Sequence, residues 1–186
     1  MKILLLDLGI SNILSVYNGL RYITNDIEVI SNYSGSSILQ QNACYVLPGV
    51  GSFDAGILAL TNTGIDKLIR NISIERYPLI GICLGMQLLL DKSDESLNGS
   101  KGLGIVPGDV KMLNRDYLKV PNIGWRKVDA SNNSNYSKYL QQDFYFVHSY
   151  SCHVPPEYMT SSVTIDNRFA YTSSYKYRSI HGFQFH

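Results

Sequence analysis

Tyr77-Pro78-Leu79-Ile80-Gly81-Ile82-Cys83-Leu84-Gly85-Met86-Gln87-Leu88-Leu89-Leu90 is the stretch that decides the fold. It begins with an apolar run over Pro78 to Ile82, which is typical of a buried strand, and a helical pattern opens over Gly85 to Asp91. Between the two, glycines flank Cys83 in the pattern G-x-C-x-G, which is typical of the sharp strand-to-helix turn that presents a nucleophile. Side chains at the two glycine positions would collide across so tight a turn.

This turn predicts a reactive thiol at Cys83. The sulfur would lie at the start of a helix, where partial positive charge favours thiolate over thiol. The backbone N–H of Leu84 would face an oxyanion formed beside the sulfur. The alternative interpretation is a buried structural cysteine in a glycine-rich turn.

The first half of the chain alternates strand-like and helical segments. Short apolar runs predict strands at Lys2 to Asp7, Ile27 to Ile30 and Ala43 to Leu47, the last ended by Pro48-Gly49. Helical patterns lie between and after them, from Ser11 or Asn12 to about Ile23, at Ala55 to Leu60 and at Ile65 to Asn71. Strands separated by helices pair in parallel, so we expect an open α/β sheet flanked by helices.

The second half is different in character, with a polar loop at Asp91 to Lys101 followed by short β-like runs and turns. The runs are Gly104 to Val106, Val110 to Leu113, Trp125 to Val128, Phe144 to Val147, Ser162 to Ile165, Phe169 to Thr172 and Gly182 to Phe185. One clear turn-rich segment is Ala130 to Asn135. We expect a mostly antiparallel extension of the parallel core, within a single domain of residues 1–186.

Composition excludes several classes of protein. The chain has 186 residues, 45% apolar and 17% charged, with a formal charge of +1. There is no basic stripe typical of nucleic-acid binding, and the apolar stretch at Ile3 to Leu6 is too short for a signal peptide or membrane span. The three cysteines are far apart with no CxxC pair, which predicts no disulfide framework, no zinc site and a reducing cytoplasm. We interpret Cys44 and Cys152 as inert thiols.

A cysteine nucleophile needs oxyanion donors and a base. The loop from Leu47 to Phe53 contains two glycines beside a strand end, so its backbone N–H groups can approach a ligand closely. His148 and His186 both end strand-like runs, at the edge where an α/β sheet presents ligands, and spacing does not separate them as the base. His153 and His181 lie in polar contexts typical of solvated surface residues.

Five segments together resemble a known family in order along essentially the whole chain. They are Pro48-Gly49-Val50-Gly51-Ser52-Phe53, Gly81 through Leu89, Val120-Pro121-Asn122-Ile123-Gly124-Trp125, Tyr145-Phe146-Val147-His148-Ser149-Tyr150 and Gly182-Phe183-Gln184-Phe185-His186. The second and fifth resemble class I glutamine amidotransferases generally. The other three resemble the glutaminase subunits of imidazole glycerol phosphate synthases.

The resemblance implies roles for matching residues. Cys83 would attack the side-chain amide of glutamine to form a thioester, and His186 would act as general base and then as acid. The other implied roles are oxyanion donors Val50 and Leu84, glutamine-pocket residues Gly51, Gln87, Ser149 and Tyr150, and subunit-interface residues Asn12, Trp125 and Tyr145. Trp125 could instead fill a core gap, and Asn12 could simply cap the first helix.

The same resemblance implies a partner. It is a (β/α)8 cyclase subunit through which ammonia reaches a bound ribonucleotide, giving imidazole glycerol phosphate and aminoimidazole carboxamide ribotide in histidine biosynthesis. Neither a cofactor nor a metal is implied.

Three positions depart from the family pattern. The family has a Glu two residues after the catalytic His, whereas this sequence stops at His186, so we expect a missing C-terminal end and a base without its orienting carboxylate. Asn122 stands where the family usually has His, and Arg126 where it usually has Asn. These departures leave two alternatives: a paralogue that feeds ammonia to a surface-sugar or other synthase, and an inactive truncated subunit that only binds its partner.

Overall fold

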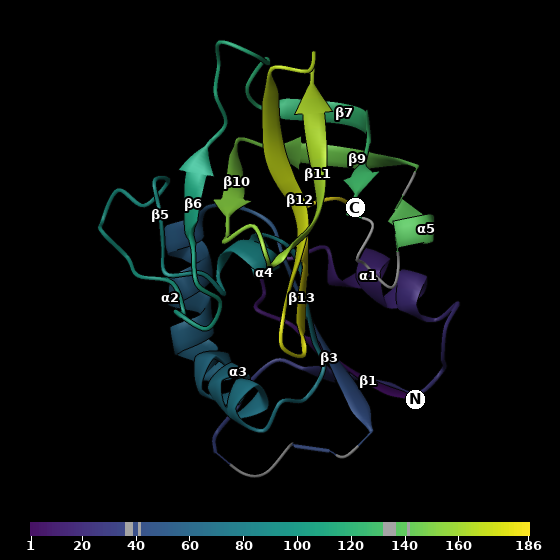
Figure 1. The fold of residues 1–186 in the computed structure, drawn as a ribbon. Helices are drawn as coiled ribbons and strands as arrows, with labels where there is room; N and C mark the ends of the chain where they lie inside the picture. The colour runs from purple at the N-terminus through teal and green to yellow at the C-terminus, as the bar shows by residue number, and fades with distance from the viewer. Residues whose placement is uncertain (36–38, 41, 132–136, 141) are drawn as a thin grey trace.

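The computed structural model describes residues 1–35, 39–40, 42–131, 137–140 and 142–186, and at its centre lies an eight-stranded sheet (Figure 1). The strand order is β2-β1-β3-β4-β13-β12-β11-β8. The first five strands in this order pair in parallel, so the expected open α/β sheet is confirmed. They are β1 (Lys2–Leu6), β2 (Ile27–Ile30), β3 (Ala43–Gly49), β4 (Leu79–Cys83) and β13 (Ile180–Phe183).

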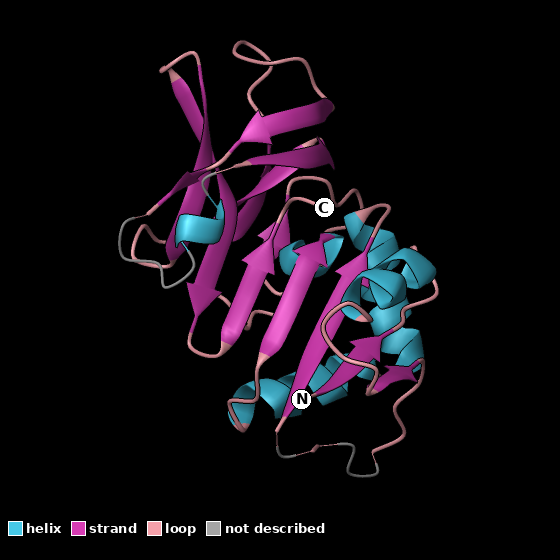
Figure 2. Cartoon of the chain, turned by 90° about the vertical axis from the view of Figure 1, so that its right-hand side faces the viewer, coloured by secondary structure: helices cyan, strands magenta, loops and turns pink. Residues whose placement is uncertain are grey.

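Helices cover both faces of the parallel strands. α1 (Ile13–Leu20) packs on one face over Ile3 and Leu5, while α2 (Phe53–Thr63) and α3 (Ile65–Ile74) contribute to the core on the other face with Leu4 and Leu6. Alternate residues of β1 therefore enter two different cores, as happens when a strand is buried on both faces. Figure 2 shows this sheet continuing into the antiparallel strands of the second half.

The helix expected over Gly85 to Asp91 is wrong in length, because α4 spans only Leu84–Gln87. The carbonyls that follow accept hydrogen bonds from a distant segment. Leu103 donates to Leu88, Gly104 to Leu90, and both Ile105 and Val106 to Leu89. The same bonds explain why the strand expected at Gly104 to Val106 is absent: its N–H groups complete a helix end rather than a β-ladder.

The antiparallel extension is confirmed, with more strands than the sequence predicted. β12 (Phe169–Tyr177), β11 (Met159–Ile165) and β8 (Asp129–Ala130) continue the main sheet. In a second sheet, β10 (Tyr150–His153) pairs antiparallel with β6 (Asp109–Met112), and β6 pairs in parallel with β5 (Lys92–Ser93). The short, polar β10 and β5 give no apolar run by which to predict them. Most of the expected turn at Ala130 to Asn135 lies outside the described residues.

A separate two-stranded ribbon lies next to the end of the parallel sheet. It consists of β7 (Asn122–Lys127) and β9 (Asp143–His148), and the short helix α5 (Ser137–Leu140) precedes β9. One face of the ribbon packs into a third core, in which Phe146 and Tyr171 are buried. No helix among the described residues has the length and apolar character needed to cross a membrane.

Tyr175 joins the two halves of the molecule. Its fully buried ring lies over Gly182, where an added Cβ would come within 2.5 Å of the ring carbon Cζ. Its hydroxyl donates to the carbonyl oxygen of Met86 at 2.8 Å. One side chain of β12 therefore contacts both β13 and the helix α4 that follows Cys83.

Candidate active site

The turn from β4 into α4 has the geometry that the glycine pattern predicted. Cys83 has φ +53° and ψ −113°, a region that non-glycine residues rarely adopt, and α4 begins at the next residue. A Cβ at Gly81 would lie 2.8 Å from the Cα of Met86, across the turn as expected. A Cβ at Gly85 would lie 1.9 Å from the carbonyl oxygen of Leu47, so the neighbouring strand β3, rather than the turn itself, excludes a side chain there.

The Cys83 thiol borders a pocket of about 490 Å³ and is 8% exposed. Burial raises the pKa of Cys83 to about 11, although the Leu84 backbone N–H and the Gln184 side chain act in the opposite direction. The expected stabilisation of thiolate by a helix start does not prevail here, because α4 has only one turn and the sulfur is buried. The resting group is therefore a thiol that needs a base.

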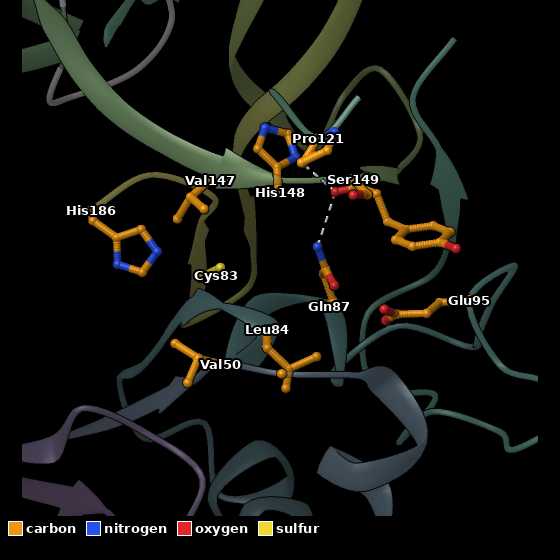
Figure 3. Close-up of a pocket in the computed structure, with 12 residues that line it drawn as sticks. Val50, Cys83, Leu84, Gln87, Glu95, Pro121, Val147, His148, Ser149 and His186 are labelled. Atoms are coloured by element: carbon orange, nitrogen blue, oxygen red, sulfur yellow. Dashed lines mark hydrogen bonds between the residues drawn. The ribbon is translucent and has the colours of Figure 1, made fainter. Parts of the chain in front are cut away.

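The pocket collects the residues expected to bind glutamine and to perform its chemistry (Figure 3). Its lining includes Val50, Gly51, Cys83, Leu84, Gln87, Ser149, Tyr150 and His186 from that set. Glu95, Pro121 and Val147 also line it and were not predicted. Glu95 lies in the loop after β5, where its carboxylate accepts a hydrogen bond from the Phe53 N–H at 2.8 Å. Nothing in a polar loop of the sequence marks this one acid as a pocket residue.

The structure separates the two candidate histidines. His148 is buried, and both ring nitrogens have partners: Nδ1 lies 2.8 Å from the Tyr150 carbonyl oxygen and Nε2 lies 3.1 Å from Asn122 Nδ2. Burial lowers the pKa of His148 to about 4. His186 is exposed, and its ring makes no hydrogen bond with any described residue. Its ring therefore has the free nitrogen that a general base needs.

His186 lies three residues beyond β13, which ends at Phe183, so the expectation that a strand runs to His186 is wrong. Its backbone N–H donates to the carbonyl oxygen of Tyr145 at 3.0 Å, which holds the residue against β9. In Figure 3 the His186 ring extends into the cavity on the side of Cys83. The His186 residue is exposed as a whole, but partial desolvation of its ring lowers the pKa of His186 from its usual value, so the neutral, proton-accepting form predominates at neutral pH. His181, expected at the surface, is half-buried on β13.

The backbone N–H groups of the two expected oxyanion donors, Leu84 and Val50, have different environments. The Leu84 N–H is the first of α4, directly after Cys83. The Val50 N–H instead donates to the carbonyl oxygen of Ile10 at 3.2 Å, so the expectation that it faces the oxyanion is wrong for this conformation. The Gly49–Val50 peptide would have to rotate before that N–H could reach the pocket.

The residues expected at a subunit interface have different environments. Trp125 is 67% exposed on the ribbon, which excludes the alternative that it fills a core gap, and its ring meets that of Tyr145 edge-on at 5.7 Å between centroids. Asn12 caps α1 by accepting a hydrogen bond from the Ser15 N–H at 3.3 Å. Asn12 also lines a small cavity of about 110 Å³ together with Pro48 and His186.

Cys44 and Cys152 are free, buried thiols whose pKa values are raised by burial, which agrees with their interpretation as inert. The described part of the chain contains no cluster of three or more His, Cys, Asp or Glu side chains suited to a metal ion.

Comparisons with known proteins agree with this geometry. The glutamine amidotransferase class-I family model matches residues 4–186. The chain is 35% identical to imidazole glycerol phosphate synthase subunit HisH 2 of Vibrio vulnificus strain YJ016, covering 100% of this chain and 86% of that protein. It is 34% identical to subunit HisH of the same synthase from Methanopyrus kandleri, over 100% and 90% of the two chains. A crystal structure of a glutamine amidotransferase superimposes with a TM-score of 0.71 at 12% identity, covering 100% of this chain and 90% of that one.

Proposed function

The chain belongs to the class I glutamine amidotransferase family, and we propose that it is the glutaminase subunit of an imidazole glycerol phosphate synthase. The observation that carries the proposal is the pocket that Cys83 shares with His186 and Gln87, at the bend where β4 meets α4. Identity of 34–35% to HisH subunits over the full chain supports this assignment within the family.

Glutamine has three groups that the pocket can recognise. The carboxylate of Glu95 suits the α-ammonium group, because charge-assisted hydrogen bonds are the strongest in proteins. Gly51, Gln87, Ser149 and Tyr150 offer backbone and side-chain polar atoms to the rest of the amino acid. This arrangement would place the side-chain amide over the sulfur of Cys83.

The reaction then follows from the protonation states. His186 takes the thiol proton while the Cys83 sulfur attacks the amide carbon, and the carbonyl oxygen becomes an oxyanion. When the carbonyl re-forms, the C–N bond breaks and the His186 imidazolium gives its proton to the leaving nitrogen, which departs as ammonia. Water, deprotonated by His186, next attacks the thioester and releases glutamate, and the sulfur recovers its proton.

Oxyanion stabilisation would depend on conformation. The Leu84 N–H supplies one donor, and the Val50 N–H supplies the second only after it leaves the carbonyl of Ile10. Loss of one such donor costs roughly 10²–10³ in kcat in other enzymes. We therefore infer that the free subunit hydrolyses glutamine slowly and becomes faster when Val50 turns towards the pocket.

The partner would be the cyclase subunit, with a (β/α)8 fold, and the complex would reside in the cytoplasm. The outer face of the β7–β9 ribbon suits such docking because Ile123, Trp125 and Val147 are 55%, 67% and 45% exposed. Exposed apolar side chains grouped in this way mark interaction surfaces. Asn12 and Tyr145 would lie at the same interface, and ammonia would pass into the barrel of the partner to give imidazole glycerol phosphate and aminoimidazole carboxamide ribotide.

The test is a glutaminase assay of the chain co-expressed with the cyclase subunit from the same genome and supplied with the ribonucleotide acceptor. We expect glutamate and imidazole glycerol phosphate in equal amounts, and no product from Cys83→Ala. Cys44→Ala removes a buried thiol remote from the pocket lining and serves as the matched control. Glutamate production by Cys83→Ala would refute the mechanism, and glutamate without imidazole glycerol phosphate would favour another acceptor.

A further inference from the structure

The side-chain amide of Asn122 is buried at the start of β7 and has three partners. Its Oδ1 accepts from Arg126 Nε at 3.0 Å. Its Nδ2 donates to the Tyr171 hydroxyl at 2.9 Å and lies 3.1 Å from His148 Nε2. Because an arginine Nε can only donate, the amide oxygen must face Arg126 and the amide nitrogen must face His148.

The tautomer of His148 is fixed from both sides of its ring. Nδ1 lies 2.8 Å from the carbonyl oxygen of Tyr150, which can only accept, so Nδ1 carries the proton. Nε2 is then the acceptor for Asn122 Nδ2. Burial keeps the ring neutral at neutral pH, since the pKa of His148 is lowered to about 4.

The Tyr150 carbonyl continues this series of contacts to the nucleophile. It accepts a second hydrogen bond from Gln87 Nε2 at 3.1 Å. In Figure 3 the dashed lines from the labelled His148 and Gln87 side chains meet at one oxygen atom. Gln87 Nε2 also donates to Gln184 Oε1 at 3.0 Å, and Gln184 Nε2 lies 3.6 Å from Cys83 Sγ. The polar contacts are therefore unbroken from Asn122 to the sulfur, through the Tyr150 backbone carbonyl and the buried side chains of His148, Gln87 and Gln184.

The other end of the series lies directly under the exposed face of the ribbon. Successive residues of β7 point to opposite faces. Asn122 and Arg126 point inward, whereas Ile123 and Trp125 point to solvent. A protein that binds the outer face and shifts β7 would move the amide that holds His148.

We propose that Asn122 is a positioning residue that ties strand β7 to the glutamine pocket through His148 and the Tyr150 carbonyl. This inference rests on the proposed glutaminase function and deepens it, because it assigns the route by which a partner on the β7–β9 ribbon acts on Gln87 and Cys83. Without the Asn122 donor, the His148 ring is free to turn, and the Tyr150 carbonyl then keeps only the donor from Gln87.

The kinetic test compares Asn122→Leu, which keeps the branched shape but removes the donor, with Tyr171→Phe, which removes another partner of the same amide. Both are assayed with saturating cyclase partner. We expect kcat/KM for glutamine to fall about 10- to 100-fold in Asn122→Leu, mainly through KM, as the loss of a buried hydrogen-bond partner implies. Tyr171→Phe should change KM less than about twofold, because His148 keeps its donor. Equal KM effects in the two variants, or no effect in Asn122→Leu, would overturn the proposal.

A second measurement does not depend on activity. In protein labelled with ¹⁵N-histidine, the wild-type His148 should show a protonated Nδ1 and an unprotonated Nε2 near neutral pH. In Asn122→Asp the carboxylate can only accept, so Nε2 should become protonated. This variant keeps the bond to Arg126 and also serves if Asn122→Leu does not fold. A wild-type proton on Nε2 would overturn the positioning role, whereas absence of glutaminase activity in the wild type with its partner would overturn the proposed function alone.

Discussion

The wall of the pocket that comes from the parallel sheet is fixed by the backbone, whereas the wall that comes from the β7–β9 ribbon and β10 is fixed by side-chain hydrogen bonds. On the first wall, Cys83 has a φ of +53°, and the turn around it is crowded by backbone: α4 leaves no room for a side chain at Gly81, and β3 leaves none at Gly85. On the second wall, a hydrogen bond between the side chains of Asn122 and His148 fixes the orientation of both groups. The nucleophile is therefore placed by steric exclusion, and the groups on the opposite wall are placed by hydrogen bonds.

The largest effect should come from a substitution in the pocket wall that the parallel sheet forms. Gly85→Ala would bring a Cβ to 1.9 Å from the carbonyl oxygen of Leu47, so β3 and α4 must separate. We expect the free energy of unfolding to fall by more than about 4 kcal/mol, measured by urea denaturation. Gly19→Ala on the exposed side of α1 has open space and should gain up to about 1 kcal/mol. If Gly85→Ala were as stable as the wild type, steric exclusion would not define this wall.

The next effect separates the two histidines. His186→Ala should lower kcat about 10²- to 10⁴-fold, as removal of a general base does, with little change in stability because the residue is exposed. His148→Ala should instead lower stability, because it leaves the buried Asn122 donor unpaired. Steady-state kinetics and denaturation of both variants check the assignment, and a larger kcat loss in His148→Ala would reverse it.

The pH dependence of stability should report on the pocket wall formed by the β7–β9 ribbon and β10. The pKa of His148 is lowered to about 4 in the folded chain and is about 6.5 in the unfolded chain. The neutral ring therefore contributes fully to the free energy of unfolding above pH 6.5, and this contribution is lost as the pH falls towards 4. Linkage sets the loss at roughly 3 kcal/mol over that window. Denaturation at several pH values should show this slope in the wild type but not in His148→Gln. Equal slopes in the two proteins would show that His148 titrates normally.

A smaller effect is expected on the outer face of the same ribbon. Trp125→Ala should weaken binding of the cyclase partner by about 2 kcal/mol, or some thirtyfold, because exposed aromatic anchors carry much of the energy of an interface. Stability of the free chain should not change. Tyr22→Ala, at a residue 95% exposed just after α1, is the control. Titration calorimetry measures the affinity of both variants for the partner. Equal losses of affinity in the two variants would show that the ribbon is not part of the interface.

The smallest effect concerns the substrate charge. Glu95→Gln keeps an acceptor for the Phe53 N–H but removes the negative charge, so KM for glutamine should rise about tenfold with kcat nearly unchanged. Asp54→Asn is the matched control. Asp54 lies in the first turn of α2, next to the Phe53 N–H that Glu95 binds, but its carboxylate binds Ser96 and Asn98 and does not line the pocket. A KM that stays constant in Glu95→Gln would exclude this contact to the α-ammonium group.

The two walls also differ in how well the sequence predicted them. The parallel strands and the bend at Cys83 could be predicted because steric limits leave visible signs, namely apolar runs and glycines at fixed spacing. The length of α4 could not, because it is ended by N–H groups from residues 103–106, far along the chain.

The remaining pocket residues required the structure for a similar reason. Glu95 enters the pocket through the path of a polar loop, and Val50 turns its N–H away towards Ile10. His148 and His186 differ in whether the ring already has hydrogen-bond partners, and a single sequence does not record hydrogen bonds.

The ring of Tyr175 over Gly182 has a consequence for how such sequences diverge. Any side chain at 182 would need the space that the ring fills, and any smaller residue at 175 would leave a void and an unpaired carbonyl at Met86. Selection should therefore remove single substitutions at residue 175 or residue 182, and only simultaneous substitutions at both should persist. Among descendants of a common ancestor, residues 175 and 182 should vary together or not at all. The contact between β12 and β13 would then be kept while the surrounding surface residues change.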